Sequence, residues 1–183
     1  MRFPLHNCPG VPINYHPGAF GFQRKGYWHI GVDLYTNNRE PVRAIENGVV
    51  VSKGLFTGPE VNSPWWETTH YLMILGKTGV FNYGEICETR WSPGDTVKEN
   101  DVIGFVKRVL FPYKARPDIP QHSTSMLHLE LYEPYITIAV DWKSPEKPKG
   151  LIDPTSILLK LFAEQNYYNI GGLCDSIKRF ERN

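Results

Sequence analysis

The sequence has little cysteine and almost no net charge. Its three cysteines, Cys8, Cys87 and Cys174, lie far apart and form no C-x-x-C pair. They predict free thiols in a reducing compartment, and neither a thiolate zinc site nor a disulfide framework. The formal net charge of +1 at pH 7 gives the chain no basic surface for nucleic acid and no polybasic patch for a membrane. We therefore expect neither nucleic acid nor an anionic membrane as the partner.

Long apolar runs are also missing. No stretch reaches the length of a transmembrane helix, so we expect no membrane insertion. Residues 1–16 contain no apolar core of a signal peptide. The sequence therefore predicts a cytoplasmic protein, with extracytoplasmic action through another export route as the alternative.

Proline and glycine, in contrast, are frequent, with 15 and 16 copies in 183 residues. Together with short apolar stretches between turn residues, they predict a mostly β protein, an antiparallel sandwich or barrel-like domain with one carboxy-terminal helix. We expect a single β-domain over residues 1–165, beginning with an irregular arm over residues 1–25. Residues 166–183 are expected to form a tail or a short helix.

The individual elements follow from local patterns. Asn47-Gly48 is a strong turn signal and predicts a hairpin between the first two strands. Residues 153–165 predict the helix, with Asp153 as the residue that caps its amino-terminal end. Strands are expected over residues 41–45, 48–52, 70–76, 80–86, 123–132 and 135–142, with two short pieces within residues 92–106.

Two polar motifs stand out from this β pattern. In the strand "STSMLHLELY", period-two alternation places three leucines on one face and Met126, His128 and Glu130 on the other. In "WHIGVD", His29 and Asp33 are four residues apart, so an extended backbone would turn both to one side. Two histidines and an aspartate make a set of three protein ligands that zinc accepts in a catalytic site. Glu130 is either a carboxylate that orients His128 or part of a salt bridge on the sheet surface.

The order of these motifs resembles the lysostaphin/LytM-type zinc metallopeptidases. The resemblance rests on "HIGVD", then "PVRAIENGVV", the turn "GDTVKENDVIG" and the final "HLEL" strand, and it covers roughly residues 20–161. Members of that family cut peptide cross-links in bacterial cell walls. The resemblance implies the duplicated hybrid motif fold, Zn²⁺ held by His29, Asp33 and His128, and a peptide or peptidoglycan-type substrate.

The sequence departs from that family at two positions. The family's last motif has a second histidine where this chain has Met126. Its earlier strand has a tyrosine and a histidine two residues apart, where this chain has Tyr83 and Glu85. In the family these two histidines orient the attacking water and stabilise the charged transition state. Their loss leaves the expected zinc ligands intact and puts catalysis in question.

Two interpretations of the altered site remain open. In the first, the protein is a hydrolase in which Glu85 is the general base and His122 or Tyr83 supplies a hydrogen-bond donor, with His70 as a further candidate. In the second, Glu85 is a fourth zinc ligand, and the protein is a catalytically silent module that binds a wall peptide, a glycan or a protein partner. We favour the first, because an ionisable group stands where proton transfer is needed.

Two long loops are expected to wall the cleft. Trp65, Trp66 and Phe56 would stack on substrate or anchor their own loop, and Arg108, Lys114 and Arg116 would attract an anionic substrate or form a solvated rim. The same turn pattern also resembles biotinyl and lipoyl carriers, and sugar-permease IIA domains share a related β-architecture. A carrier needs a lysine at a hairpin tip, which "ENGVV" lacks. A phosphocarrier needs two facing histidines, but Met126 occupies one of the two candidate positions, so the sequence disfavours both alternatives.

Overall fold

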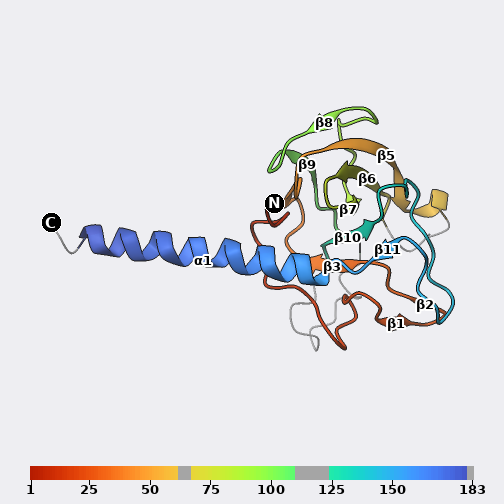
Figure 1. Ribbon diagram of the computed structural model, residues 1–183, viewed down its shortest axis with the longest axis horizontal. Coiled ribbons are helices and arrows are strands. Elements are labelled where there is room, and N and C mark those ends of the chain that lie inside the picture. The colour runs from red at the N-terminus through yellow and green to blue at the C-terminus, as the bar shows by residue number, and fades with distance from the viewer. Residues whose placement is uncertain (62–66, 110–123, 181–183) are drawn as a thin grey trace.

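The computed structural model describes residues 1–61, 67–109 and 124–180, with side chains described up to residue 167. The fold is mostly antiparallel β with one helix, as the sequence predicts (Figure 1). Cys8 and Cys87 are free thiols. Within the described ranges, no helix is long and apolar enough to cross a membrane.

A seven-stranded antiparallel sheet forms the body of the domain. Strand β10 lies inside it, with β7 along one side and β3 followed by β11 along the other. The remaining strands continue from β7 in the order β6, β5, β8. The bounds are β3 Val32–Tyr35, β5 Gly48–Thr57, β6 Thr69–Gly76, β7 Val80–Ile86, β8 Thr96–Val97, β10 Met126–Tyr132 and β11 Leu151–Ile152. A short 3-10 turn, Pro59–Val61, follows β5.

Two short strand pairs flank this sheet. Strand β1 (Gln23–Arg24) pairs with β2 (Tyr27–Trp28), and β4 (Pro41–Arg43) pairs with β9 (Val102–Phe105). The first pair belongs to the arm that leads into the polar motif around His29. The arm also contributes Phe3 and Leu5 to the hydrophobic core, so it is part of the packed domain.

The period-two prediction for β10 is confirmed. Leu127, Leu129 and Leu131 are fully buried in the main core. Met126 and Tyr132 belong to two other clusters, on the opposite face of the strand. We call that opposite face the site face, because His128 and Glu130 also project from it. Truncating one of the core leucines to alanine would cost about 2–5 kcal/mol, so the register of β10 is strongly fixed.

The predicted hairpin around Asn47-Gly48 is wrong. Strands β4 and β5 belong to different sheets and do not pair. The turn between them is held by other segments: Glu46 accepts hydrogen bonds from the backbone and hydroxyl of Thr78, and Asn47 accepts one from Glu99 N–H. These contacts turn the two strands apart, which overrides the local turn signal.

The strand predicted over residues 135–142 is also wrong, because this segment is an irregular loop. A turn closes where Ile136 N–H donates to the Glu133 carbonyl, and the Trp142 carbonyl accepts from Trp28 N–H. The loop also packs through its side chains, since Trp142 stacks on Trp28 and contacts Phe20. Packing against the arm therefore replaces sheet pairing.

The predicted helix is present and longer than expected. Helix α1 spans Thr155–Phe180, so it continues through most of the region predicted as a tail or short helix. Asp153 accepts a hydrogen bond from Thr155 N–H, as expected of a cap. Leu158 and Leu161, in the first turns of the helix, are buried and pack against the core. The later turns extend away from the β-domain (Figure 1).

Candidate metal centre

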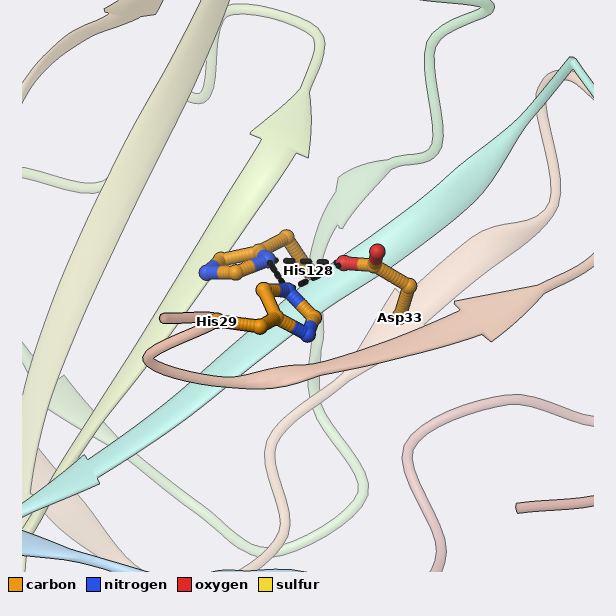
Figure 2. Close-up of side chains that lie close together, drawn as sticks. All are labelled: His29, Asp33 and His128. Carbon is orange, nitrogen blue, oxygen red and sulfur yellow. Dashed lines mark hydrogen bonds and ion pairs between the residues drawn. The ribbon is translucent and has the colours of Figure 1, made fainter. Parts of the chain in front are cut away.

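The three side chains predicted as zinc ligands converge on one point. Asp33 Oδ1 lies 2.8 Å from His128 Nδ1 and 3.0 Å from His29 Nε2, and the two nitrogens are 3.1 Å apart (Figure 2). All three residues are buried. They form the group of potential metal ligands found in the described part of the chain.

Pairing of β3 with β10 brings these distant residues together. In the register, Asp33 lies directly opposite His128, although they are 95 residues apart in the sequence. His29 approaches from the segment that joins β2 to β3. Gly31, in that segment, must be glycine, because a Cβ there would lie 2.6 Å from the Leu129 carbonyl oxygen and 2.9 Å from the His128 ring. The glycine thus allows the backbone to press against β10 and the imidazole.

Hydrogen bonds to the outer nitrogens fix both rings. His29 Nδ1 is 2.9 Å from the Ala19 carbonyl oxygen, which can only accept, so this nitrogen carries the proton and Nε2 presents a lone pair. His128 Nε2 is 2.9 Å from Glu130 Oε1, which likewise leaves Nδ1 as the inward nitrogen. A carboxylate or carbonyl behind a ligand histidine is the usual way in which a metal site orients the ring. Glu130 therefore has the first of its two predicted roles.

Glu130 is itself fully satisfied and fully buried. Its Oε2 atom accepts hydrogen bonds from Asn82 Nδ2 and from the Tyr132 hydroxyl, each at 2.7 Å. The Tyr132 hydroxyl also accepts from Val140 N–H at 3.3 Å. This chain of contacts ties the His128 ring to β7 and to the loop after β10.

Charges around the cluster shift its pKa values strongly. Burial alone would raise the pKa of Asp33, but His29, His128 and Arg24 outweigh it and hold that pKa well below the ordinary range. Burial lowers the pKa of His29. Burial also opposes a charged His128, yet its hydrogen bonds to Asp33 and Glu130 prevail and raise its pKa to about 10. Without a cation at the cluster, a proton on His128 thus neutralises the facing donor atoms.

The donor set fits zinc. Zinc bonds of about 2.0–2.1 Å place the ligand atoms of a tetrahedral site about 3.3 Å apart, close to the 2.8–3.1 Å observed between these three atoms. Two imidazole lone pairs that face one carboxylate oxygen need a proton or a cation between them. Imidazole nitrogen and carboxylate oxygen are both ligands that zinc accepts.

Glu85 reaches the neighbourhood of this cluster through a β-bulge. Leu72 pairs with Tyr83 and His70 pairs with Ile86, so β7 has two residues, Gly84 and Glu85, opposite the single Tyr71 of β6. Glu85 has φ of 62°, a left-handed conformation that is unfavourable for a non-glycine residue. A bulge of this kind redirects a side chain and is frequent beside functional sites. Here it breaks the alternation that would place Glu85 on the face of Tyr83.

The Glu85 carboxyl is buried without full compensation. Its side chain is 5% exposed, and Oε2 has no hydrogen-bond partner among the described residues. Burial, reinforced by the charge of Asp33, raises the pKa of Glu85 to about 8. Glu85 is not part of the three-residue ligand group. A buried carboxyl with a raised pKa, one oxygen of which has no partner among the described residues, is a candidate for proton transfer.

An apolar cluster occupies the position of the histidine that the family carries at residue 126. Met126 packs with Tyr35 and Val109, and all three are buried. Tyr35 lies opposite Met126 in the pairing of β3 with β10 and on the same face of β3 as Asp33. This side of the site thus presents a thioether and an aromatic ring where the family presents an imidazole.

The other candidate residues have varied positions. Tyr83 lies in the main core, where its hydroxyl accepts a hydrogen bond from Ile45 N–H, so the structure does not bring it to the three ligands. His70 is on β6 with a buried Nδ1 that lacks a partner among the described residues. Phe56 packs over Gly84 and against the His128 ring, with centroids 5.2 Å apart.

Several predicted residues lie outside the described ranges. They are His122, Trp65, Trp66, Lys114 and Arg116. Sequence reasoning missed Arg24, which contacts Asp33, and also Asn82 and Tyr132, which contact Glu130. Tyr132 could have been found, because it is two residues beyond Glu130 on the same face. Asn82 and Arg24 required the register of β7 and the path of the arm.

Comparisons with known proteins identify the fold. No protein-family model matches the sequence, and no curated protein matches it. Among solved structures, the chain is similar to the antimicrobial peptidase lysostaphin from Staphylococcus simulans, with 19% identity and a TM-score of 0.52 over 86% of this chain and 56% of that one. It is also similar to LytU, with 18% identity and a TM-score of 0.50 over 81% of this chain and 84% of that one. The predicted resemblance is confirmed, and at this identity it establishes the fold.

Proposed function

We propose that this protein is a zinc-dependent peptidase that hydrolyses peptide bonds in a cell-wall-type substrate such as peptidoglycan. The observation that carries the proposal is the convergence of His29, Asp33 and His128 on one point. Their fold is shared with lysostaphin, which is an antimicrobial peptidase. The cell-wall substrate rests on the motif order of the sequence.

The three ligands would hold zinc with at least one position left for solvent or substrate, because none of the other described carboxylates or histidines joins the group. A zinc ion bound there would supply Lewis acidity, making water a nucleophile near neutral pH and polarising a peptide carbonyl. Glu130 and the Ala19 carbonyl keep the two imidazoles in the tautomer that this requires.

Glu85 is the residue we assign to proton transfer. Peptide hydrolysis requires a base that takes a proton from water and an acid that gives it to the leaving nitrogen. A carboxyl with a pKa of about 8 can do both near neutral pH, and its placement on a bulge beside the ligands supports the role. His122 stays a predicted donor for the developing negative charge.

The test is hydrolysis of purified peptidoglycan and of synthetic cross-bridge peptides by the zinc-loaded protein, followed as release of new amino groups and by mass spectrometry. Glu85→Gln should retain zinc and lose about 10²–10⁴-fold in rate, the usual contribution of a general base. Glu88→Gln is the matched control, since Glu88 is exposed and close in sequence. Unchanged hydrolysis by Glu85→Gln would contradict the assignment of Glu85.

A second function is favoured by one observation. At residue 126, where the lysostaphin/LytM-type family has a histidine, this chain has an apolar cluster of Met126, Tyr35 and Val109, which offers no charge to a transition state. A zinc-containing module that binds a wall peptide, a glycan or a protein partner without cleaving it would tolerate that change. This alternative predicts that the zinc-loaded protein binds peptidoglycan fragments and releases no amino groups from them. If Glu85 is the fourth zinc ligand in that module, Glu85→Gln should also lower the zinc affinity.

A further inference from the structure

Arg24 binds one of the two carboxylate oxygens of Asp33, and the other oxygen faces the two histidines. The Arg24 Nη2 atom donates to Asp33 Oδ2 at 2.8 Å and to the Pro17 carbonyl oxygen at 2.9 Å. The other oxygen, Oδ1, faces His128 and His29. Arg24 comes from strand β1 of the arm, while Asp33 comes from the main sheet. The contact therefore ties the arm to the candidate ligand.

The surroundings of the ion pair between Arg24 and Asp33 restrict the orientation of the Asp33 carboxylate. Its side chain is 26% exposed, and the Asp33 side chain is 6% exposed, so the ion pair is poorly accessible to water. Gly18 lies against the Asp33 Cβ, where any larger residue would come within 3.0 Å of it. With Pro17 behind the guanidinium and Gly18 against the carboxylate stem, Asp33 has little freedom to rotate and offer both oxygens to one ion.

We propose that Arg24 is a specificity-determining residue that keeps Asp33 a ligand through one oxygen only, and so makes the site selective for zinc. This inference rests on the proposed metal site. Ions such as Mn²⁺ favour higher coordination numbers and oxygen-rich sites, which a carboxylate binding through both oxygens supplies. Zinc prefers four ligands at short distances. Because the Arg24 guanidinium is bound to Oδ2, that oxygen is not available to a metal ion.

The positive charge of Arg24 also lies close to the point where a cation would bind. Electrostatic repulsion from it lowers the affinity for every divalent ion, so removing Arg24 should not simply weaken binding. The distinctive effect is a change in preference. Without Arg24, Mn²⁺ should gain relative to Zn²⁺ by at least about tenfold, the lower end of effects known for residues that support metal ligands.

The experiment compares the wild-type protein with Arg24→Met, which keeps the length of the side chain and removes its donors. Competition with a chromogenic chelator gives the affinities for Zn²⁺ and Mn²⁺, and absorption of the Co²⁺-substituted protein reports the coordination number, since the visible bands weaken as ligands are added. We expect Arg24→Met to reduce the preference for Zn²⁺ over Mn²⁺ and to weaken the visible absorption bands of the Co²⁺-substituted protein. Lys25→Met is the matched control, because Lys25 is the next residue along and is exposed.

The outcomes separate the two proposals. If the wild-type protein binds neither Zn²⁺ nor Co²⁺, the metal site itself is refuted. If it binds both, and Arg24→Met has the same preference and the same Co²⁺ spectrum, the role of Arg24 is refuted while the metal site stands. If Arg24→Met does not fold, as judged by near-ultraviolet circular dichroism, Arg24→Gln removes the charge, keeps a polar side chain on the hairpin and is read in the same way.

Discussion

Two groups of side chains lie at the site face of the sheet, and they differ in how many polar atoms they contain and in how many of these atoms have hydrogen-bond partners. The candidate metal-binding group, His29, Asp33 and His128, has every outer polar atom engaged by Ala19, Arg24 or Glu130. The Met126 group, Met126 with Tyr35 and Val109, presents mainly apolar atoms. Glu85 belongs to neither group, and it is buried with one oxygen that has no partner in the described part of the chain.

The difference means that the candidate metal ligands and the residue proposed for proton transfer are separate parts of the site. The candidate metal-binding group is supported from three directions, as expected of residues that must hold ligand atoms in a fixed geometry. Met126 packs with Tyr35 and Val109, whereas the contacts behind the three candidate ligands come from Ala19, Arg24 and Glu130. Glu85, which a bulge has turned from its regular position, is the residue that we propose for proton transfer.

The largest expected effect comes from breaking the metal-binding group itself. His128→Ala should abolish zinc binding, measured by inductively coupled plasma mass spectrometry after dialysis. Asp33 and Glu130 would lose their shared partner, which costs about 3–5 kcal/mol of stability for a buried charge pair. His6→Ala is the control, since His6 is exposed. Full zinc occupancy in His128→Ala would refute the ligand set.

The next effect comes from the support behind the ligand. In Glu130→Gln, one carboxylate oxygen becomes an NH₂ donor that meets another donor at either position: His128 Nε2–H at one, and Asn82 Nδ2 with the Tyr132 hydroxyl at the other. We expect the zinc affinity to fall by about 10–100-fold. Competitive chelator titration measures it, with exposed Glu133→Gln as the control. An unchanged affinity would mean that Glu130 does not orient His128.

A third effect isolates Glu85 in the metal-free protein. Its folded-state pKa, about 8, is above the ordinary value of 4.5, so the folded state holds this proton more tightly than the unfolded state. The resulting stability is fully present below pH 4.5 and is lost as the pH rises toward 8, by at most about 1.4 kcal/mol per pH unit.

Glu85→Gln should therefore be more stable than wild type by a margin that grows between pH 5 and pH 8. Urea unfolding at a series of pH values measures the difference, and groups that titrate in both proteins cancel. Parallel stability curves would show that folding does not raise the pKa of Glu85 and would contradict the prediction.

The smallest effect comes from the outer end of the network. Tyr132→Phe removes one of three hydrogen bonds to Glu130 and the acceptor for Val140 N–H. We expect a loss of about 1 kcal/mol in unfolding free energy and a decrease of only a few-fold in zinc affinity. Tyr15→Phe, at a 95% exposed position, is the control. A loss as large as that of Glu130→Gln would show that Tyr132, more than Asn82, sets the position of Glu130.

The sequence predicted those features that depend on local patterns. Strand β10 follows from alternation, β6 and β7 follow from short apolar stretches between turn residues, and the start of α1 follows from Asp153. The ligand set came from the resemblance, because no local rule brings His29 and His128 together across 99 residues.

What failed depended on tertiary contacts. Asn47-Gly48 forms no hairpin because Glu46 is held by Thr78, and residues 135–142 form no strand because Trp142 packs on Trp28. Arg24 could not be predicted as a support for Asp33, since their contact depends on how the arm folds back on the sheet.

The most direct test of the account is a crystal structure of the protein grown with zinc, with the ion identified by its anomalous signal and its content measured in solution. We predict one zinc bound by His29 Nε2, Asp33 Oδ1 and His128 Nδ1, with solvent completing its coordination and Glu85 within hydrogen-bond reach of that solvent. Absence of zinc from this cluster would contradict the metal site. Zinc capped by the Glu85 carboxylate would contradict the peptidase and favour the binding module.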